Sequence, residues 1–267
     1  MKLSRVSPIV TLTTDFGLVD HYVGTLKGVL LSLCPDARLV DISHEIAPYS
    51  IYSGAYTIDQ AAPYFPSGTV HLVVVDPGVG TSRKPVLMEA LGQYFIAPDN
   101  GVLAMIGTRD GRPRLREIAN RDLWLEAPSA TFHGRDVFAP VAAAIASGQA
   151  TPEEVGPALT RWELLPDLDP HPVGEGRWRG KLLSVDRFGN AITNFKASEF
   201  VAVASSNFAL HMGNREITEF RATFGSGAPD LCFAYFGSSG YIEVGMNQRS
   251  AAAFLEVSPG DSIGLRW

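Results

Sequence analysis

Residues 71–85, with the sequence HLVVVDPGVGTSRKP, constrain the fold more than any other stretch of the chain. The apolar, β-branched run at residues 72–75 is typical of a strand that is buried on both faces. Asp76-Pro77-Gly78 ends that strand, because proline fixes φ and glycine allows a tight turn. Open α/β sheets bind ligands where a charged residue and a glycine-containing loop follow a buried strand. Taken alone, the stretch is equally consistent with a strand and a turn stabilised by a local aspartate.

Strand and helix patterns alternate through the first 147 residues or so. This alternation predicts an α/β domain with a mostly parallel central sheet. The expected strands are residues 8–14, 38–42, 69–75, 85–90, 94–96 and 114–118, with the last at an edge of the sheet. The expected helices are residues 20–33, with Asp20 as N-cap, 50–64 and 135–147, with a helical turn at 102–106.

Acidic residues recur where the expected strands of this domain end. They are Asp15, Asp41, Asp76 and Asp99. The carboxyl ends of parallel strands share one edge of a sheet, so we expect these carboxylates to converge on a site. A magnesium or two-metal site is an alternative, since hard cations prefer oxygen ligands. Arg83 and Arg135 lie close in sequence to these acids, however, and no HxD or HExxH pattern is present, which favours a site without metal.

The pattern changes after residue 165. Residues 166–180 are rich in Pro and Gly, lack apolar periodicity and predict a linker. Beyond it, short strands with close turns and almost no helix indicate a smaller all-β barrel domain. The expected strands are residues 181–185, 201–203, 208–212, 217–220, 231–236, 241–244 and 262–265. We therefore expect an α/β domain at 1–165, a linker at 166–180 and a β-barrel domain at 181–267.

Composition narrows the function classes. The formal net charge of −6 argues against a surface that tracks nucleic-acid phosphates. No apolar run approaches the length of a membrane span, and the first ten residues lack the apolar core of a signal peptide. Cys34 and Cys232 lie far apart, without zinc-ligand spacing, and indicate buried thiols. We expect a cytoplasmic protein without a nucleic-acid or membrane partner.

Several polar residues each have a functional and a structural interpretation. Asp15 can accept hydrogen bonds from ribose hydroxyls or form an Asx turn. His133 precedes an alanine-rich helix, whose dipole keeps the imidazole neutral, so it can accept a proton, fix a water molecule or be structural. The polar stretch 186–194 can bind a base and an ammonium group or form a turn, and so can the residues around Ser238 and Asn247. No GxGxxG or P-loop motif supports ordinary nucleotide phosphate binding.

Six motifs occur in order along nearly the whole chain: TLTTDFG, LVDISHEI, VVVDPGVGT-R, PDNG, FHGRDVFAP and VDRFGNAITN. Together they resemble those of the S-adenosyl-L-methionine (SAM) hydroxide adenosyltransferases, which are related to SAM-dependent fluorinating and chlorinating enzymes. The resemblance implies a larger α/β domain, a small β-barrel domain and a homotrimer. It further implies that the substrate lies between the N-terminal domain of one subunit and the C-terminal domain of its neighbour, with no cofactor and no metal.

The resemblance also implies roles for single residues. Asp76, Arg83 and His133 match a water-activating triad. The implied substrate contacts are Asp15 to the ribose diol, Asp186 to the methionine amine, Phe188 and Asn190 to adenosine, Ser238 to the methionine end, and Tyr49 at a stacking position held by tryptophan in the halogenating enzymes. Asn247 is a further candidate from the residues alone, since its amide can bind a base or form a turn. Ser239 and Met246 stand where those relatives have arginines.

Two positions separate the hydrolytic from the halogenating branch. The halogenating enzymes have a hydroxyl residue where this chain has Gly134, and they lack an aspartate at the position of Asp76. A halide here would lose a hydrogen-bond donor and face a carboxylate, so water is the better nucleophile. We expect hydrolysis of SAM to adenosine and L-methionine. The alternatives are a halide adenosyltransferase, a binding module that does not turn SAM or adenosine over, and a metal-dependent hydrolase.

Overall fold

The computed structural model describes residues 7–223 and 231–267. The chain folds as two compact units, residues 1–165 and residues 166–267. Each unit has its own hydrophobic core, which identifies it as a domain, and each is described separately below.

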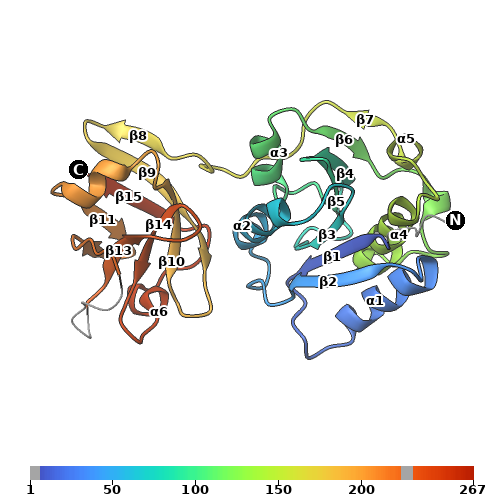
Figure 1. Cartoon of the computed structure of the whole chain (residues 1–267), viewed down its shortest axis with the longest axis horizontal. Helices are drawn as coiled ribbons and strands as arrows, with labels where there is room; N and C mark the ends of the chain where they lie inside the picture. Colours follow the sequence, from blue (N-terminus) through green and yellow to red (C-terminus); the bar gives the residue numbers. More distant parts are fainter. Residues whose placement is uncertain (1–6, 224–230) are drawn as a thin grey trace, which may run out of the picture. The chain divides into compact units, whose positions relative to one another are not determined.

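The first unit is built on a seven-stranded sheet (Figure 1). Its strands are β1 (Ile9–Thr14), β2 (Arg38–Ser43), β3 (Val70–Val74), β4 (Pro85–Ala90), β5 (Gln93–Pro98), β6 (Arg114–Glu117) and β7 (Ala158–Leu159). They follow the order β2-β1-β3-β5-β4-β6-β7. The four strands β2, β1, β3 and β5 are parallel, and β4, β6 and β7 extend the sheet in antiparallel fashion. The predicted α/β class is confirmed, with a sheet that is parallel in its core only.

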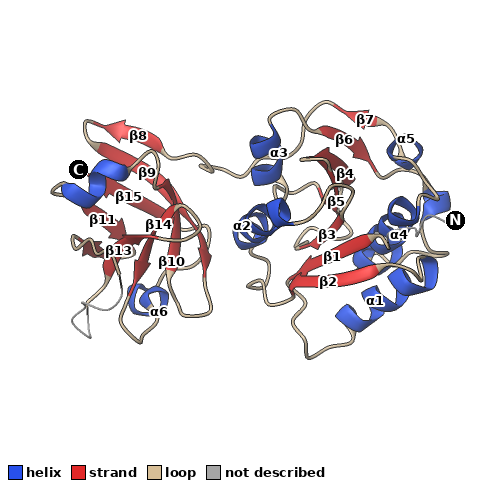
Figure 2. Cartoon of the chain, viewed as in Figure 1, coloured by secondary structure: helices blue, strands red, loops and turns tan. Residues whose placement is uncertain are grey.

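Helices cover both faces of this sheet (Figure 2). They are α1 (Tyr22–Leu33), α2 (Ile51–Ala61), α3 (Ala104–Asp110), α4 (Ala139–Ser147) and α5 (Pro152–Val155), with short turns η1 (Ala62–Tyr64), η2 (Arg121–Leu123) and η3 (Gly134–Phe138). α1 and α4 pack on one face against Leu12 and Leu72, whereas α2 packs on the other face against Val73 and Val75. β3 is buried along its whole length because it lies between these two layers.

Three local predictions in this unit were wrong. α1 begins at Tyr22 with His21 as N-cap, and Asp20 does not cap it. The segment expected as one helix from residue 135 starts as the π-helical turn η3 and becomes α-helical only at Ala139. β6 is not the edge strand, because the two-residue strand β7 pairs with it.

The second unit is an antiparallel barrel. Its strands are β8 (His171–Gly174), β9 (Arg177–Val185), β10 (Ala191–Lys196), β11 (Ala209–Met212), β12 (Arg215–Ile217), β13 (Phe233–Phe236), β14 (Tyr241–Gly245) and β15 (Ser262–Arg266). The order β12-β11-β15-β9-β10-β14-β13 is nearly closed by a bridge between Phe220 and Ala234. Its core is rich in aromatic and aliphatic side chains such as Phe195 and Leu265. The predicted β-barrel class is confirmed.

Parts of this unit differ from the sequence-based expectation. Residues 201–203 belong to a 3₁₀ turn, η4 (Val201–Ser205), and do not form a strand. The short helix α6 (Ala251–Leu255) and the strand β10 were not predicted. The segment 166–180, expected as a linker, contains β8 and the first residues of β9. β8 pairs with β9, so this segment contributes to the barrel sheet.

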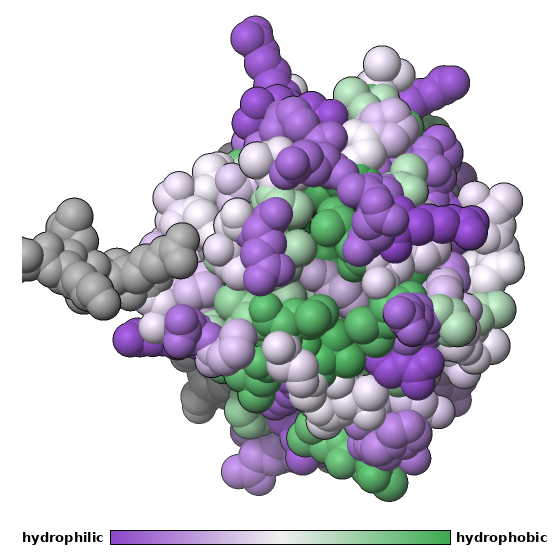
Figure 3. All heavy atoms as spheres, turned by 90° about the vertical axis from the view of Figure 1, so that its right-hand side faces the viewer, coloured by the Kyte–Doolittle hydropathy of each residue, from purple (hydrophilic) through white to green (hydrophobic). Residues whose placement is uncertain are grey.

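Apolar side chains also reach the surface of the first unit. Figure 3 shows them gathered in a band across one otherwise polar face. α1 buries Leu26 and Leu30 in the core and leaves Leu31 and Leu33 exposed, so this helix is apolar on more than one side. Among the described residues, no helix is long and apolar enough to cross a membrane.

Candidate active site

The loop after β3 carries a buried ion pair. Asp76 accepts two hydrogen bonds from Arg83, one from Nε to Oδ1 at 2.9 Å and one from Nη2 to Oδ2. Both side chains are over nine-tenths buried, at 6% and 8% exposure. The guanidinium lies over the Phe138 ring, 5.2 Å from its centroid. Bidentate pairing of this kind fixes the plane of the guanidinium as well as its position.

His133 joins this pair through Arg83. The Arg83 Nη2 atom lies 2.9 Å from His133 Nδ1. A guanidinium can only donate, so Nδ1 accepts and the proton of the neutral imidazole sits on Nε2. Burial and the charge of Arg83 lower the pKa of His133, against smaller opposing effects of Asp76 and Asp136. His133 is therefore neutral at neutral pH, and Arg83 lies between it and Asp76.

One donor of Arg83 has no acceptor. Its Nη1 atom is buried and makes no hydrogen bond to any residue that the structure describes. Leaving a buried donor unpaired costs about 1–3 kcal/mol, and more for a charged group. Such a donor beside a neutral imidazole is suited to an electron-rich oxygen, such as that of a water molecule or hydroxide.

Asp15 lies near this cluster at the end of β1. Its Oδ2 accepts the Tyr49 backbone N–H at 2.9 Å. Burial raises the pKa of Asp15, and the charge of Asp76 adds to this effect, which places the two carboxylates within electrostatic range of each other. Tyr49 has a positive φ of 65°, and the residue is 72% exposed. The structure thus brings Asp15, Tyr49 and the Asp76–Arg83–His133 cluster to the carboxyl edge of the sheet.

In the second unit, Asp186 organises the turn between β9 and β10. Its Oδ1 accepts the backbone N–H groups of Phe188, at 2.9 Å, and Asn190, at 2.8 Å. Its Oδ2 accepts Asn190 Nδ2 at 2.7 Å. The start of the polar stretch 186–194 therefore forms a turn, which is the structural interpretation given for it above. The turn still presents a carboxylate, an amide and the Phe188 residue, which is 80% exposed.

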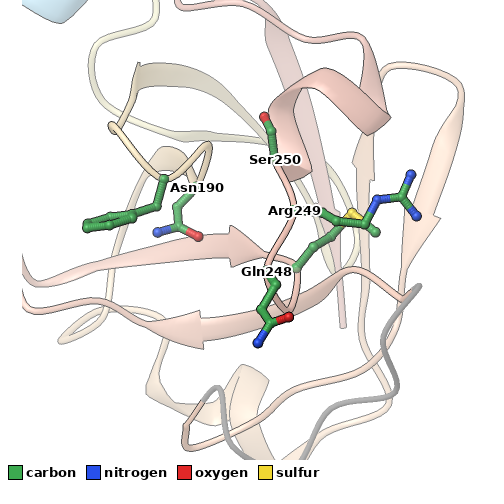
Figure 4. Close-up of a pocket in the computed structure, with 6 residues that line it drawn as sticks. Asn190, Gln248, Arg249 and Ser250 are labelled. Atoms are coloured by element: carbon green, nitrogen blue, oxygen red, sulfur yellow. The ribbon is translucent and has the colours of Figure 1, made fainter.

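A pocket of about 490 Å³ opens beside this turn. It is lined by Phe188, Asn190, Met246, Gln248, Arg249 and Ser250. Figure 4 shows the Asn190 amide extending toward the middle of the pocket. The Arg249 guanidinium lies on the opposite side and points away from Asn190. Sequence reasoning identified Phe188 and Asn190 but missed Gln248, whose positive φ of 55° is an unusual backbone conformation for a residue other than glycine. Asn247 precedes Gln248 in the chain and is not among the lining residues.

Ser238 lies in the turn between β13 and β14. Ser239 of this turn donates a hydrogen bond to Oε1 of the buried Glu243 at 2.8 Å. The hydroxyl of Tyr235, in β13, donates to Oε2 of the same carboxylate at 2.6 Å. A Cβ at Gly237 would overlap with the same carboxylate. The Glu243 side chain therefore supports the turn that carries Ser238.

Comparison with known proteins identifies the family from the two units independently. Residues 10–156 match the SAM hydroxide adenosyltransferase N-terminal domain, and residues 180–264 match the SAM hydroxide adenosyltransferase C-terminal domain. The chain belongs to the SAM hydroxide adenosyltransferase family.

Relatives of this adenosyltransferase cover nearly all of the chain. It is 39% identical to an (R)-S-adenosyl-L-methionine hydrolase of Salinispora tropica, over 96% of this chain and 97% of that protein. A fluorinase of Nocardia brasiliensis is 28% identical, over 97% of each chain. A crystal structure of an uncharacterized conserved protein from Thermotoga maritima superimposes with a TM-score of 0.84 at 38% identity, over 97% of this chain and 100% of that chain.

Two of the four strand-end acids of this adenosyltransferase lie outside the cluster. Asp41 is inside β2, where it pairs with Lys27 at 2.6 Å and lies 3.0 Å from His44. Asp99 accepts the Glu163 backbone N–H at 2.9 Å. Among the described residues, neither side chain makes a hydrogen bond or ion pair with Asp76, Arg83 or His133; each is engaged by its own neighbours. Within the described ranges, no group of three or more His, Cys, Asp or Glu side chains could hold a metal ion.

His44 is a supporting residue of the adenosyltransferase that sequence reasoning did not single out. Its Nδ1 lies 2.8 Å from the Thr14 hydroxyl, and its carbonyl accepts the Gly17 N–H at 2.8 Å. These bonds hold both sides of the turn at Asp15. The available signal was the polar Ser43-His44-Glu45 directly after an expected strand, in the motif LVDISHEI.

Proposed function

We propose that this protein hydrolyses SAM to adenosine and L-methionine. The observation that carries the proposal is the Asp76–Arg83–His133 cluster, in which the Asp76 and Arg83 side chains are buried and Arg83 Nη1 has no acceptor among the described residues. The 39% identity to a protein named (R)-S-adenosyl-L-methionine hydrolase supports the same activity.

The reaction is an in-line displacement at the ribose C5′ atom. The water oxygen forms a bond to C5′ while the C5′–S bond breaks, and the electron pair of that bond leaves with sulfur as the thioether of methionine. No general acid is needed, because the sulfonium is already a good leaving group. Negative charge on the nucleophile and positive charge on sulfur cancel as the new bond forms, so a site that excludes bulk water favours the transition state.

Arg83 and His133 prepare the nucleophile. Arg83 Nη1 donates to the water oxygen, and Asp76 fixes the guanidinium in place. Because Nε2 already carries a hydrogen, His133 accepts the proton of water at Nδ1. Water must first displace the Arg83 Nη2 donor from Nδ1, while Asp76 keeps the guanidinium in place through its bond to Arg83 Nε. Such base assistance contributes about 10²–10⁴ to a rate. Because the pKa of His133 lies below its usual value, turnover should persist below pH 6.5.

The two units divide substrate binding. In residues 1–165, Asp15 accepts hydrogen bonds from the ribose hydroxyls and Tyr49 contacts the substrate beside it. Residues 181–267 supply the other contacts. These are Asp186 to the methionine ammonium group, Phe188 and Asn190 to adenosine, Ser238 to the methionine end and Asn247 through its amide. Burial of Asp15 and the exposed ring of Phe188 support these assignments.

We further propose a homotrimer in which each site draws on two subunits, as the family resemblance implies. Light scattering on the purified protein measures the assembly state. Mixing Arg83→Lys and Asp186→Asn subunits tests the shared site, since some sites in mixed trimers would carry neither change. Recovery of activity above that of either parent supports shared sites, and no recovery contradicts them.

The name of the Salinispora relative specifies the R epimer at sulfur. We propose the same preference here, because one fixed approach of the nucleophile to C5′ demands one arrangement of the groups on sulfur. Chiral chromatography of a mixture of both epimers, followed over time, measures it. Equal consumption of the two epimers contradicts the preference.

Isotope placement tests the reaction itself. In ¹⁸O-labelled water, the label should appear in the 5′-hydroxyl of adenosine. Label in methanol indicates attack on the methyl group and overturns the proposal. SAM that stays intact during long incubation at high protein concentration indicates a binding module, and chloride-dependent 5′-chloro-5′-deoxyadenosine indicates a halide adenosyltransferase.

SAM is the substrate in this proposal, and Arg83 supplies the positive charge that a metal ion would otherwise provide. Activity should therefore survive dialysis against a chelator, and its loss would point to a metal-dependent hydrolase. We also propose that the protein acts in the cytoplasm. Cys34 and Cys232 are free thiols, as expected in a reducing compartment.

A further inference from the structure

The turn after His133 contains a buried carboxylate that has no role in the reaction described above. Asp136 is only 3% exposed and lies in η3. Its Oδ1 accepts Arg135 Nε at 2.6 Å, and its Oδ2 accepts Arg135 Nη2 at 2.9 Å and the Ser129 backbone N–H at 2.8 Å. Turns of π-helical geometry are rare and often occur at functional sites.

The backbone of Asp136 binds the same loop. Its carbonyl accepts the Leu125 N–H at 2.9 Å, and its own N–H donates to the Phe132 carbonyl at 3.2 Å. Side chain and backbone together therefore hold residues 125–132 against η3. His133 follows this segment directly, so its orientation depends on these bonds.

The same segment contacts the loop that carries Asp76 and Arg83. A Cβ at Gly80 would lie 2.7 Å from the Ala130 carbonyl oxygen, closer than real Cβ contacts come. Gly80 also has a positive φ of 78°, which favours glycine. Because the two loops fit this closely, a shift of residues 129–132 changes the distance between His133 and Arg83.

We propose that Asp136 is a positioning residue that holds His133 within hydrogen-bond distance of Arg83. This inference rests on the proposed function. Three charged groups face His133: Arg83 and Asp76 from the loop after β3, and Asp136 from η3. The charge of Asp136 raises the pKa of His133, against the lowering effects of burial and Arg83. Asp136 therefore acts on the charge state of His133 as well as on its position.

Asp136→Asn keeps the size of the side chain and removes its charge. We expect kcat to fall on the order of 10²-fold with KM little changed, because the catalytic groups and not the substrate contacts are displaced. We also expect the pKa of His133 to fall further. NMR titration of the imidazole, assigned among the six histidines by its loss in His133→Asn, measures this shift in the free protein.

Asp59→Asn is a matched control in the same unit. Asp59, on α2, is 2% exposed and accepts hydrogen bonds from Nε of Arg109 at 2.7 Å and from its Nη2 at 2.6 Å. It is therefore also a buried carboxylate with a bidentate arginine partner. It should lower the melting temperature to a similar degree while leaving kcat and the titration of His133 unchanged.

Two results would overturn the inference. One is an Asp136→Asn protein that is folded and has wild-type kcat and His133 titration. The other is an Asp59→Asn protein with the same losses, which would reduce the effect to general stability. If the wild-type protein releases no adenosine from SAM, the proposed function fails instead, and the titration still tests Asp136 because it needs no substrate.

Discussion

The loop after β3 and the turn after β9 each have an aspartate within two residues of the strand end. They differ in how far along the chain the hydrogen-bond partners of that aspartate lie. Asp76 bonds to Arg83, seven residues away, which reaches His133 a further 50 residues along the chain. Within the described part of the chain, the side chain of Asp186 accepts hydrogen bonds only from Phe188 and Asn190, two and four residues away. A carboxylate with distant partners assembles a reactive cluster, whereas one with near neighbours shapes a turn that presents other groups.

The largest expected effect comes from breaking the long-range cluster. Arg83→Lys keeps a charge beside Asp76, but a single ammonium nitrogen cannot reproduce the positions of the Arg83 Nε, Nη2 and Nη1 donors. We expect kcat to fall by about 10²–10³ with little change in KM, as when a donor to a developing negative charge is lost. Steady-state kinetics measures both constants. Arg109→Lys at the Asp59 pair is the control, and an Arg83→Lys protein with near wild-type kcat would contradict the role of Arg83.

His71 sharpens the comparison because it has distant partners but no access to substrate. It is fully buried, 2.7 Å from the Thr11 hydroxyl and 3.2 Å from Gln93 Oε1. Burial lowers its pKa from 6.5 to about 4. The folded state therefore binds fewer protons than the unfolded state between these values, so stability is complete above pH 6.5 and is lost as pH falls toward 4.

The loss should reach about 3 kcal/mol of the free energy of unfolding, since one pKa unit corresponds to about 1.4 kcal/mol. Urea denaturation at several pH values measures it. His71→Gln should flatten this dependence relative to the wild-type protein while kcat at neutral pH stays unchanged. An unchanged slope would show that other groups govern acid stability.

The Asp186 turn should respond in KM and not in kcat. Asn at this position can still accept the two backbone N–H groups, but it loses the charge and faces the Asn190 amide with a second donor. We expect Asp186→Asn to raise KM about tenfold, the effect of weakening one charge-assisted hydrogen bond. A fall in kcat similar to that of Arg83→Lys would show that the two regions do not divide the work in this way.

The smallest effect is expected at Gly134. A Cβ there meets Phe132 and Phe16 at 3.5 Å and Leu26 at 3.6 Å, which are ordinary contacts, so Gly134→Ser should fold normally. The Asp76–Arg83–His133 cluster is unchanged in this variant, so we expect hydrolysis to remain the main reaction in high chloride. Product analysis by mass spectrometry and a thermal melt test both points. A switch to the chlorinated nucleoside would show that the hydroxyl alone decides between the two reactions.

Sequence reasoning succeeded where a physical pattern is long or a motif is specific. The buried strand at β3 and the alternation around it predicted the α/β class. Arg83 and His133 were linked to Asp76 through the resemblance, because no local rule joins residues so far apart. Val201–Ser205 was mistaken for a strand because its valines have high β propensity, although the segment forms a 3₁₀ turn.

Other features give too little local signal. α6 has five residues, fewer than periodicity can identify. The position of Asp41 and Asp99 at strand ends did not predict their partners, Lys27 and the Glu163 N–H, since these come from other elements. Asp136 lies in the first turn of the helix expected at 135–147, where acids are common, and only its bonds to Ser129 and Leu125 reveal its position.

Gly237 and Glu243 have a consequence for how this family can vary. The backbone at Gly237 does not have the positive φ that usually demands glycine, yet the Glu243 carboxylate fills the space of any Cβ there. The two positions are therefore coupled. A side chain at 237 requires the Glu243 side chain to move or to become smaller, and either change disturbs the hydrogen bonds that Ser239 and Tyr235 donate to it. In an evolving lineage a substitution at either position therefore passes through a loosened turn at Ser238.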